Sequence, residues 1–361
     1  MDDPRVAQLA NLLVERCLDV QPGWQVTIRT SPLARPLVRE LARAIARRGA
    51  YALPRLSWEL ERLAVDIPWA LEAPLELLEE LAPIELYQGM NDDARLTIMA
   101  PEDAHAGATV PPERLSRIQR SLEPAAKRSR ALEVAWCVVQ FPTEAAAAQA
   151  GMSLAEYEDF VYDACLLDWD AEGTRMQRLA DRFARADRVR IVGEGTDLTL
   201  SIAGRTGVVS QGRRNMPDGE FFFSPVEDSA EGVIAYSEFP ASYLGRDVED
   251  ARLVFREGRV VEATASSGED FLVGMLDTDE GSRRLGELGI GCNPHITRHT
   301  RNLLFDEKMD GTVHLALGAS YTYTGGLNQS AIHWDMVKDL RGGGELWCDG
   351  ELVQRDGRWL I

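Results

Sequence analysis

The pattern of hydrophobic residues changes near Asp187, and this change limits the ways in which the 361-residue chain can fold. Before it, helix-spaced and strand-like segments alternate, whereas after it short strands dominate, from VRIVGEG at 189–195 to ELWCDGELV at 345–353. A chain of this length has the size of two ordinary domains. We therefore expect an N-terminal α/β domain over residues 1–186 and a β-rich α+β domain, carrying the chemistry, over residues 187–361.

The N-terminal half has the pattern of an open, parallel α/β sheet. Residues 4–19 and 32–48 carry apolar side chains at helical spacing, and WQVTIRT at 24–30 alternates as a strand does. Further strands are expected at 51–56, 85–87, 96–99 and 132–139. The order strand, helix, strand predicts right-handed parallel crossovers. No phosphate-loop or dinucleotide-binding glycine pattern follows the first strand, so nucleotide binding has no support.

Charge and cysteine content exclude several classes of protein. The formal net charge is −19, which argues against a nucleic-acid partner and against an anionic membrane surface. The cysteines are odd in number, widely spaced and without a CxxC pair, which favours a reducing, cytoplasmic location. We also expect no signal peptide in the acidic N-terminal segment and no membrane-spanning run.

Four of the five histidines lie in the C-terminal half, and two of them lie in strand-like runs. In SAIHWDMV, His333 and Asp335 are two residues apart and would share a face of a strand, as two metal ligands can. On spacing alone, the common arrangement of a histidine hydrogen-bonded to a neighbouring acid is favoured over a metal site. His314 lies between Val and Leu in GTVHLALG, and taken alone it is more often a core residue than a ligand.

Other residues are weaker candidates when each is taken alone. Glu220 precedes three phenylalanines, and Glu287 lies between apolar residues and glycines. A buried carboxylate needs a partner, and a divalent metal is one such partner. His295 and His299 have the i, i+4 spacing of a zinc-binding helix, but no HExxH pattern accompanies them, so a structural role is favoured. A serine or cysteine nucleophile is weakly supported, because no GxSxG elbow occurs.

Taken in chain order, these signals form a series of motifs: GTDL (195–198), NMPDGE (215–220), DSAEG (228–232), GELGIG-N-P (286–294), FDEK (305–308), GTVHLALGASY (311–321), GG-N-S (325–330) and HWD (333–335). The series resembles the metallo-aminopeptidase family of aminopeptidases T and S across the whole C-terminal half. The N-terminal half is similar more loosely, through PGWQVTI and the helix and strand that follow it. The stretch between Tyr321 and His333 is short, which leaves substrate specificity open.

The resemblance implies a set of functional residues and a cofactor. Matched motif by motif, the metal ligands would be Glu220, Glu287, His314, His333 and Asp335, with Tyr321 nearby. They would hold two divalent ions, Zn, Co or Mn, that activate a bridging water for attack on the first peptide bond. One ion could also bind the free α-amine of the peptide. The resemblance further implies a homodimer.

Two catalytic roles follow from this chemistry. Tyr321 would donate a hydrogen bond to the developing oxyanion. Glu287 would carry the proton to the leaving amine if it is not permanently a ligand, and Glu307 in FDEK is the alternative.

Two other functions remain open for the same scaffold. His314, His333 and Asp335 form a set of two histidines and one carboxylate that would also suit a non-haem iron, ring-opening dioxygenase. The presence of Glu220 and Glu287 favours two metals and hydrolysis instead. A catalytically silent binding protein would be expected to lack a ligand or Tyr321, and none is missing.

Overall fold

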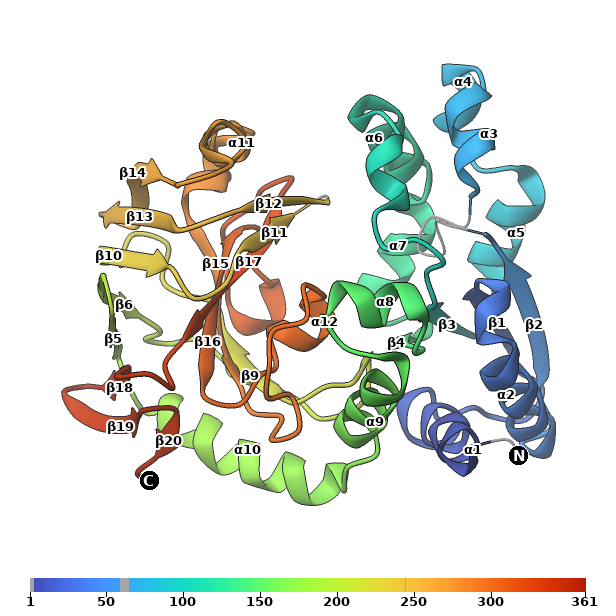
Figure 1. Cartoon of the computed structure of the whole chain (residues 1–361), viewed down its shortest axis with the longest axis horizontal. Coiled ribbons are helices and arrows are strands. Elements are labelled where there is room, and N and C mark those ends of the chain that lie inside the picture. Colours follow the sequence, from blue (N-terminus) through green and yellow to red (C-terminus); the bar gives the residue numbers. More distant parts are fainter. Residues whose placement is uncertain (1–2, 59–64, 244) are drawn as a thin grey trace. The chain divides into compact units, whose positions relative to one another are not determined.

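The computed structural model describes residues 3–58, 65–243 and 245–361 (Figure 1). The chain forms two compact units, one of Met1–Leu167 with Gly212–Pro217 and one of Asp168–Gln211 with Asp218–Ile361. Helix α10 (Trp169–Phe183) precedes Asp187 in sequence but groups with the second unit, because Met176, Leu179 and Phe183 join its hydrophobic core. The expected fold class, a parallel α/β part and a β-rich part, is confirmed. Whether the two parts are independent domains stays a prediction.

The first unit is built on a five-stranded parallel sheet in the order β2-β1-β3-β4-β8. Its strands are β1 (Gln25–Thr30), β2 (Tyr51–Leu56), β3 (Ala94–Met99), β4 (Ala135–Gln140) and β8 (Asn215–Met216). The outer strand β2 bonds to β1 through alternate residues, since Tyr51 and Ser57 donate their N–H groups to Trp24 and Thr30. The backbone nitrogen of Pro54 therefore points away from β1, so its missing N–H costs no hydrogen bond between the two strands.

Helices fill most of the remaining sequence of the first unit. They are α1 (Pro4–Leu12), a π-helix at Leu13–Cys17, a 3-10 turn at Pro32–Ala34, α2 (Arg35–Arg47), α3 (Ile67–Glu72), α4 (Leu75–Leu78), α5 (Pro83–Asn91), a 3-10 turn at Ala106–Thr109, α6 (Pro112–Ser121), α7 (Glu123–Arg130), α8 (Glu144–Gln149) and α9 (Leu154–Cys165). The strand expected at 85–87 is wrong, because these residues lie in α5. Pro83 at the start of α5 suits a helix, and three residues are too few to define a period.

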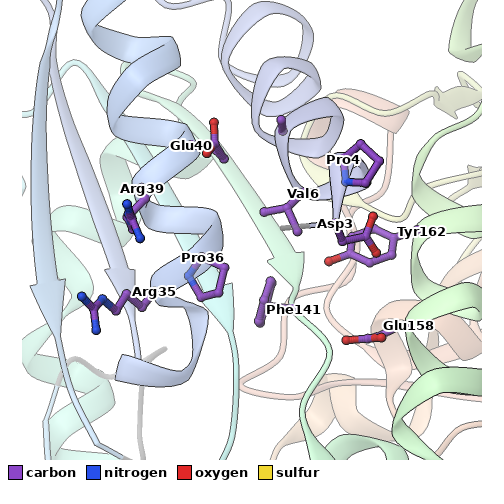
Figure 2. Close-up of a pocket in the computed structure, with 11 residues that line it drawn as sticks. Asp3, Pro4, Val6, Arg35, Pro36, Arg39, Glu40, Phe141, Glu158 and Tyr162 are labelled. Carbon is purple, nitrogen blue, oxygen red and sulfur yellow. The ribbon is translucent and has the colours of Figure 1, made fainter. Parts of the chain in front are cut away.

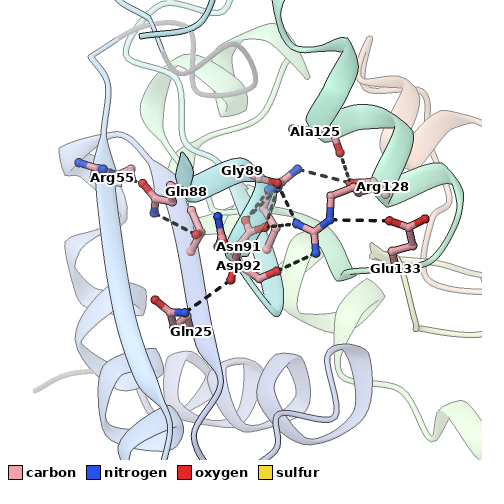
Figure 3. Close-up of polar contacts among 12 residues, drawn as sticks. Gln25, Arg55, Gln88, Gly89, Asn91, Asp92, Ala125, Arg128 and Glu133 are labelled. Carbon is pink, nitrogen blue, oxygen red and sulfur yellow. Dashed lines mark hydrogen bonds and ion pairs between the residues drawn. The ribbon is translucent and has the colours of Figure 1, made fainter. Parts of the chain in front are cut away.

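A buried charge network joins the end of α5 to β3 and α7. The Asp92 carboxylate, which is 1% exposed, accepts hydrogen bonds from Arg95 Nε at 2.9 Å and from Arg128 Nη1 at 3.1 Å. Figure 3 shows Arg128 extended between Asp92 and Glu133. Because two guanidinium groups surround one buried carboxylate, each charge has a partner, and the three segments are locked together.

The second unit contains an eight-stranded sheet in the order β14-β13-β10-β6-β5-β18-β19-β20 and a two-stranded sheet, β11-β12. These strands are β5 (Arg188–Gly193), β6 (Thr196–Ser201), β10 (Glu231–Tyr236), β11 (Ala241–Tyr243), β12 (Arg246–Val248), β13 (Ala251–Arg256), β14 (Arg259–Thr264), β18 (Glu345–Cys348), β19 (Glu351–Arg355) and β20 (Arg358–Trp359). The remaining helical pieces are α11 (Glu269–Leu276), α12 (Leu303–Asp306) and 3-10 turns at Glu280–Arg283 and Thr322–Thr324.

The third sheet of this unit has five strands in the order β17-β16-β15-β9-β7 (Figure 1). Its strands are β7 (Val208–Ser210), β9 (Glu220–Phe223), β15 (Leu285–Gly291), β16 (Thr312–Gly318) and β17 (His333–Asp339), and all neighbours are antiparallel. One face supplies apolar side chains such as Phe221, Leu288 and Trp334 to the core. The opposite face of strands β9, β15, β16 and β17 carries the predicted site.

Candidate metal centre

The strand registers bring the five predicted ligands onto one face of the sheet. Paired residues of antiparallel strands share a face, and residues two apart on a strand do so as well. Glu220 pairs with Gly291, and His314 pairs with Gly289, which places both beside Glu287 on β15. Ala316 pairs with both Glu287 and Asp335, and Gly318 pairs with His333. The structure thus brings all five residues together, from four different strands.

Small residues between the ligands leave room for them. A Cβ atom added to Gly289 would lie 1.9 Å from Nε2 of His314, so no side chain fits at this position. No side chain fits at Gly291 either, because a Cβ atom added there would lie 2.1 Å from the carbonyl oxygen of Met309. In the GELGIG motif, glycine is therefore needed at 289 because of the His314 imidazole and at 291 because of the Met309 carbonyl.

The ligand atoms form two groups that share Glu287. Glu220, Glu287 and His314 place one ligand atom each within 4.8 Å of one another, and so do Glu287, His333 and Asp335. Nε2 of His314 is 3.3 Å from Glu287 Oε1, and Nε2 of His333 is 3.4 Å from Glu287 Oε2. The two oxygens of one carboxylate thus face the two histidines.

Neighbouring groups orient the two histidines and the tyrosine. Nδ1 of His333 lies 2.8 Å from the carbonyl oxygen of Ala319, so a proton on Nδ1 would be donated there and leave the Nε2 lone pair for the cluster. Tyr321 packs against His333 with ring centroids 5.4 Å apart and against Phe222 with centroids 5.5 Å apart. Burial raises the pKa of the Tyr321 hydroxyl above its usual value, so the group stays a hydrogen-bond donor.

The buried charges of the cluster shift one another strongly. Burial raises the pKa of Glu220 to about 8 and the pKa of Asp335 to about 6. For Glu287 burial acts in the same direction, but both histidines outweigh it and lower the pKa to about 2. Burial alone would lower the pKa values of both histidines, but Glu287 raises that of His314 to about 9. Asp335, with Glu287, raises that of His333 to about 10. Protons therefore balance the charge of the cluster when no cation does.

These residues fit a divalent metal. In the described part of the chain, Oε2 of Glu220 is buried without a hydrogen-bond partner and lies 3.4 Å from Nε2 of His314. A cation would satisfy that oxygen and replace the protons that the histidines hold. Carboxylate oxygens with imidazole nitrogens suit Zn, Mn and Co.

Lys308 is a charged residue of the site that the sequence analysis did not single out. It is fully buried, its ammonium contacts Glu307 Oε1, and it lies 3.5 Å from Glu220 Oε1. Its signal was present in the FDEK motif, where a lysine follows two acids, but its burial could not be read from the sequence.

The pair His295 and His299 is not brought into either ligand group among the residues that the structure describes. His295 is exposed, whereas His299 stacks on Phe239 with centroids 4.6 Å apart and lies 3.2 Å from Asp306. The structural role favoured for His299 agrees with these contacts.

The first unit has an open groove of about 550 Å³ that lies among α1, α2, α9 and the end of β4 (Figure 2). Figure 2 shows Arg35 and Arg39 on one side and Glu158 and Tyr162 on the other, so the charges of the lining are mixed. Both ligand groups found among the described residues belong to the second unit, whereas the residues that line the groove belong to the first. None of the helices that the structure describes is long and apolar enough to cross a bilayer.

The buried cluster of three carboxylates and two imidazoles is typical of a metalloenzyme. The chain belongs to the thermophilic metalloprotease family: the model of that family, described as Thermophilic metalloprotease (M29), matches residues 2–359. The resemblance inferred from the motifs is thereby confirmed.

Individual proteins named as aminopeptidases are also similar to this chain. Aminopeptidase T of Thermus thermophilus is 29% identical over 413 aligned positions, which cover 98% of this chain and 98% of that protein. Aminopeptidase AmpS of Bacillus subtilis is 34% identical over 200 positions, 46% of this chain and 48% of that protein. The solved structure of wild-type AmpT from Thermus thermophilus superimposes with a TM-score of 0.85 at 26% identity, covering 99% of both chains.

A 2,5-dihydroxypyridine dioxygenase from Pseudomonas putida also shares the fold, with a TM-score of 0.59 over 99% of this chain and 97% of that chain. Its sequence identity is 15%, so this likeness is one of fold alone. The metalloprotease assignment is favoured over the dioxygenase alternative, because the family match and the aminopeptidase relatives agree with each other.

Proposed function

We propose that this protein is a metallo-aminopeptidase that removes the N-terminal residue from peptides by metal-dependent hydrolysis. Membership of a metalloprotease family and relatives named as aminopeptidases support the proposal. The observation that carries it is the pair of ligand groups that share Glu287, as expected of a site for two neighbouring cations.

In this proposal, each ligand group would hold one divalent ion. Glu220, Glu287 and His314 would hold the first, and Glu287, His333 and Asp335 would hold the second. Two such ions supply Lewis-acid polarisation of the scissile carbonyl and a water with a pKa near neutrality. The Ala319 carbonyl keeps the His333 ring in the orientation that this arrangement needs.

Tyr321 is the proposed oxyanion donor. Its ring is fixed by Phe222 and His333, and also by Tyr323, with centroids 5.1 Å apart, so the hydroxyl direction is set before substrate binds. A preorganised donor of this kind stabilises the charge that develops on the carbonyl oxygen in the transition state.

We extend the proposal to Zn, Co or Mn as the metal and to a cytoplasmic homodimer. All five cysteines are buried as free thiols, which is compatible with a reducing compartment. Light scattering on the purified protein tests the dimer, which a monomeric mass would contradict.

The central test is metal content by elemental mass spectrometry on protein purified without chelator, followed by hydrolysis of Leu-p-nitroanilide with added Zn, Co or Mn. We expect about two divalent ions per chain. Chelation should abolish hydrolysis and metal should restore it, whereas N-acetyl-Leu-p-nitroanilide should resist cleavage. One iron per chain without hydrolysis would instead support the dioxygenase.

A further inference from the structure

The order of the strands in the first unit creates a switch point between β1 and β3. The chain passes from β1 to β2 on one side of β1 and then crosses back to β3 on the other side. Right-handed crossovers in opposite directions run over opposite faces of a sheet. In open α/β sheets, ligands bind outside the carboxyl ends of the strands at such a point. The carboxyl ends of β1 and β3 are therefore where this fold favours a ligand site.

Arg29, the next-to-last residue of β1, is a buried cation at this switch point. The residue is 8% exposed, and its backbone is paired with Arg55 of β2 and Thr97 of β3. Within residues 3–58, 65–243 and 245–361, its Nε atom is buried without a hydrogen-bond partner, and no carboxylate forms an ion pair with it. A buried charge is costly unless a group of opposite charge pairs with it.

The carboxylates nearest in electrostatic effect are paired with other arginines. Glu85 Oε1 lies 3.6 Å from Nη2 of Arg55. Asp92 pairs with Arg95 at 2.8 Å and with a second arginine at 3.1 Å. Burial, and to a smaller degree Arg95, lowers the pKa of Arg29, and the two carboxylates do not offset this effect. Because a guanidinium stays protonated at neutral pH, the charge of Arg29 is retained without a counter-charge from these acids.

A second buried donor lies on the same face of the sheet. Ser57 follows β2 directly, and its N–H continues the ladder to the Thr30 carbonyl at 3.0 Å. Being two residues beyond Arg55, it shares the face of Arg55 and Arg29. Ser57 is 5% exposed, and its hydroxyl has no hydrogen-bond partner among the described side chains and backbone. Arg55 donates to Gln88 (Figure 3) and keeps 41% of its side chain exposed, so this face is open to solvent.

We propose that the carboxyl end of β1 in the first unit binds a small oxyanion, with Arg29 as its main donor and Arg55 and Ser57 as further donors. The ligand class is a phosphate or a compact dicarboxylate, because a guanidinium donates two parallel N–H groups to two oxygens of either group. A nucleotide is not the ligand class, since no glycine-rich phosphate cradle follows β1. The site does not depend on the proposed aminopeptidase activity.

Titration calorimetry of the full chain with inorganic phosphate and with succinate, in a buffer whose only other anion is chloride, tests the site and distinguishes the two ligands. We expect saturable binding of at least one of them. Arg29→Met should weaken that binding by about 10–100-fold, because hydrogen bonds to a charged group are lost. Arg39→Met is the matched control. It removes an arginine of the same unit that lines the groove of Figure 2, and it should change the affinity by less than about twofold.

Urea unfolding gives an independent measurement. Without phosphate or succinate, Arg29→Met should be at least as stable as the wild type, because methionine removes a buried charge that has no partner. A saturating anion should stabilise the wild type and reverse that order. Arg29→Lys keeps the charge but loses the planar fork, so it should bind more weakly than the wild type.

Three results would overturn the proposal. The first is a wild type that binds neither anion. The second is binding that Arg29→Met retains, or that Arg29→Met and Arg39→Met weaken equally, since the anion would then lie elsewhere, for example at the metal centre, or would respond only to net charge. The third is an Arg29→Met protein that is destabilised without the anion, because Arg29 would then be paired within the protein itself.

Discussion

At the residue scale, Gly289 shows how tightly the site is built. In Gly289→Ala the new methyl group would overlap His314 Nε2, so the imidazole must move away from Glu287. We expect metal content to fall below one ion per chain and kcat to fall by about 10² or more. Gly274→Ala in α11 is the control, because an added Cβ there meets nothing within 4 Å. It should be neutral or stabilise by about 0.5–1 kcal/mol.

The Tyr321 hydroxyl gives a second prediction at this scale. Tyr321→Phe keeps the aromatic packing with Phe222 and His333 but removes the donor. We expect kcat to fall by about 10²–10³-fold, while two ions per chain remain bound. Elemental analysis beside steady-state kinetics checks both parts. Loss of metal would show that the hydroxyl is a ligand and would contradict the oxyanion role.

His299 gives a prediction for the pH dependence of stability. Burial, with a smaller effect of Arg301, lowers its pKa to about 4, so the native ring stays neutral. As pH falls below about 6.5, the unfolded chain takes up a proton that the native chain does not, and stability is lost until about pH 4. Against His299→Asn, the wild type should lose about 3 kcal/mol more between pH 7 and 4.

Urea unfolding at each pH measures that difference. Asp306, whose own pKa burial raises to about 7, and Asp247 remain in both proteins, so their titration largely cancels in the comparison. His295→Asn, at the exposed histidine of the same loop, is the control and should follow the wild type. Parallel curves for wild type and His299→Asn would contradict the prediction.

At the scale of elements, Asp279 connects the segments that lead into two ligand-bearing strands. Its carboxylate accepts from Gly281 N and Ser282 N before β15, and from Ala331 N at 2.7 Å and the Ser330 hydroxyl at 3.0 Å before β17. One side chain therefore links the segments that precede the strands of Glu287 and His333.

Asp279→Ala should destabilise the protein by about 2 kcal/mol, because several buried or half-buried donors lose their acceptor. It should also lose metal faster during dialysis, since β15 and β17 are then held less firmly. Asp277→Ala is the control, because Asp277 is largely exposed and forms a surface ion pair with Arg283. We expect it to cost less than about 1 kcal/mol. Normal metal retention in Asp279→Ala would limit Asp279 to a role in stability.

At the scale of the whole molecule, the two compact units should respond to different perturbations. Asp92→Asn weakens the buried network of the first unit and should lower its stability by about 3–5 kcal/mol. Chelation acts on the second unit, where a ligand at 100 times its Kd contributes about 2.7 kcal/mol.

Calorimetry should therefore show two transitions, one lowered by Asp92→Asn and the other by chelator. Asp159→Asn is the control for the first unit, because the Asp159 side chain is 70% exposed and its pair with Arg5 lies at the surface. A single transition that both perturbations lower equally would show that the units unfold together.

Local sequence patterns were sufficient to predict several strands of this structure and the residues of the candidate site. Alternation of apolar residues marked β16 and β17, and a period of two placed His333 and Asp335 on one face. The motif order identified the family and all five residues of the cluster. A strand period depends on neighbours in sequence, so it can be read without knowledge of the fold.

Tertiary structure alone decided the rest. The register between β9, β15 and β16 brings Glu220 and Glu287 to His314, although they are far apart in sequence. Segment 85–87 became part of a helix, and α10 joined the second unit because its apolar face completes that core. The burial of Lys308 beside Glu307 depends on what packs around it. Register, burial and charge pairing arise from contacts between distant segments, and a pattern within one segment does not contain them.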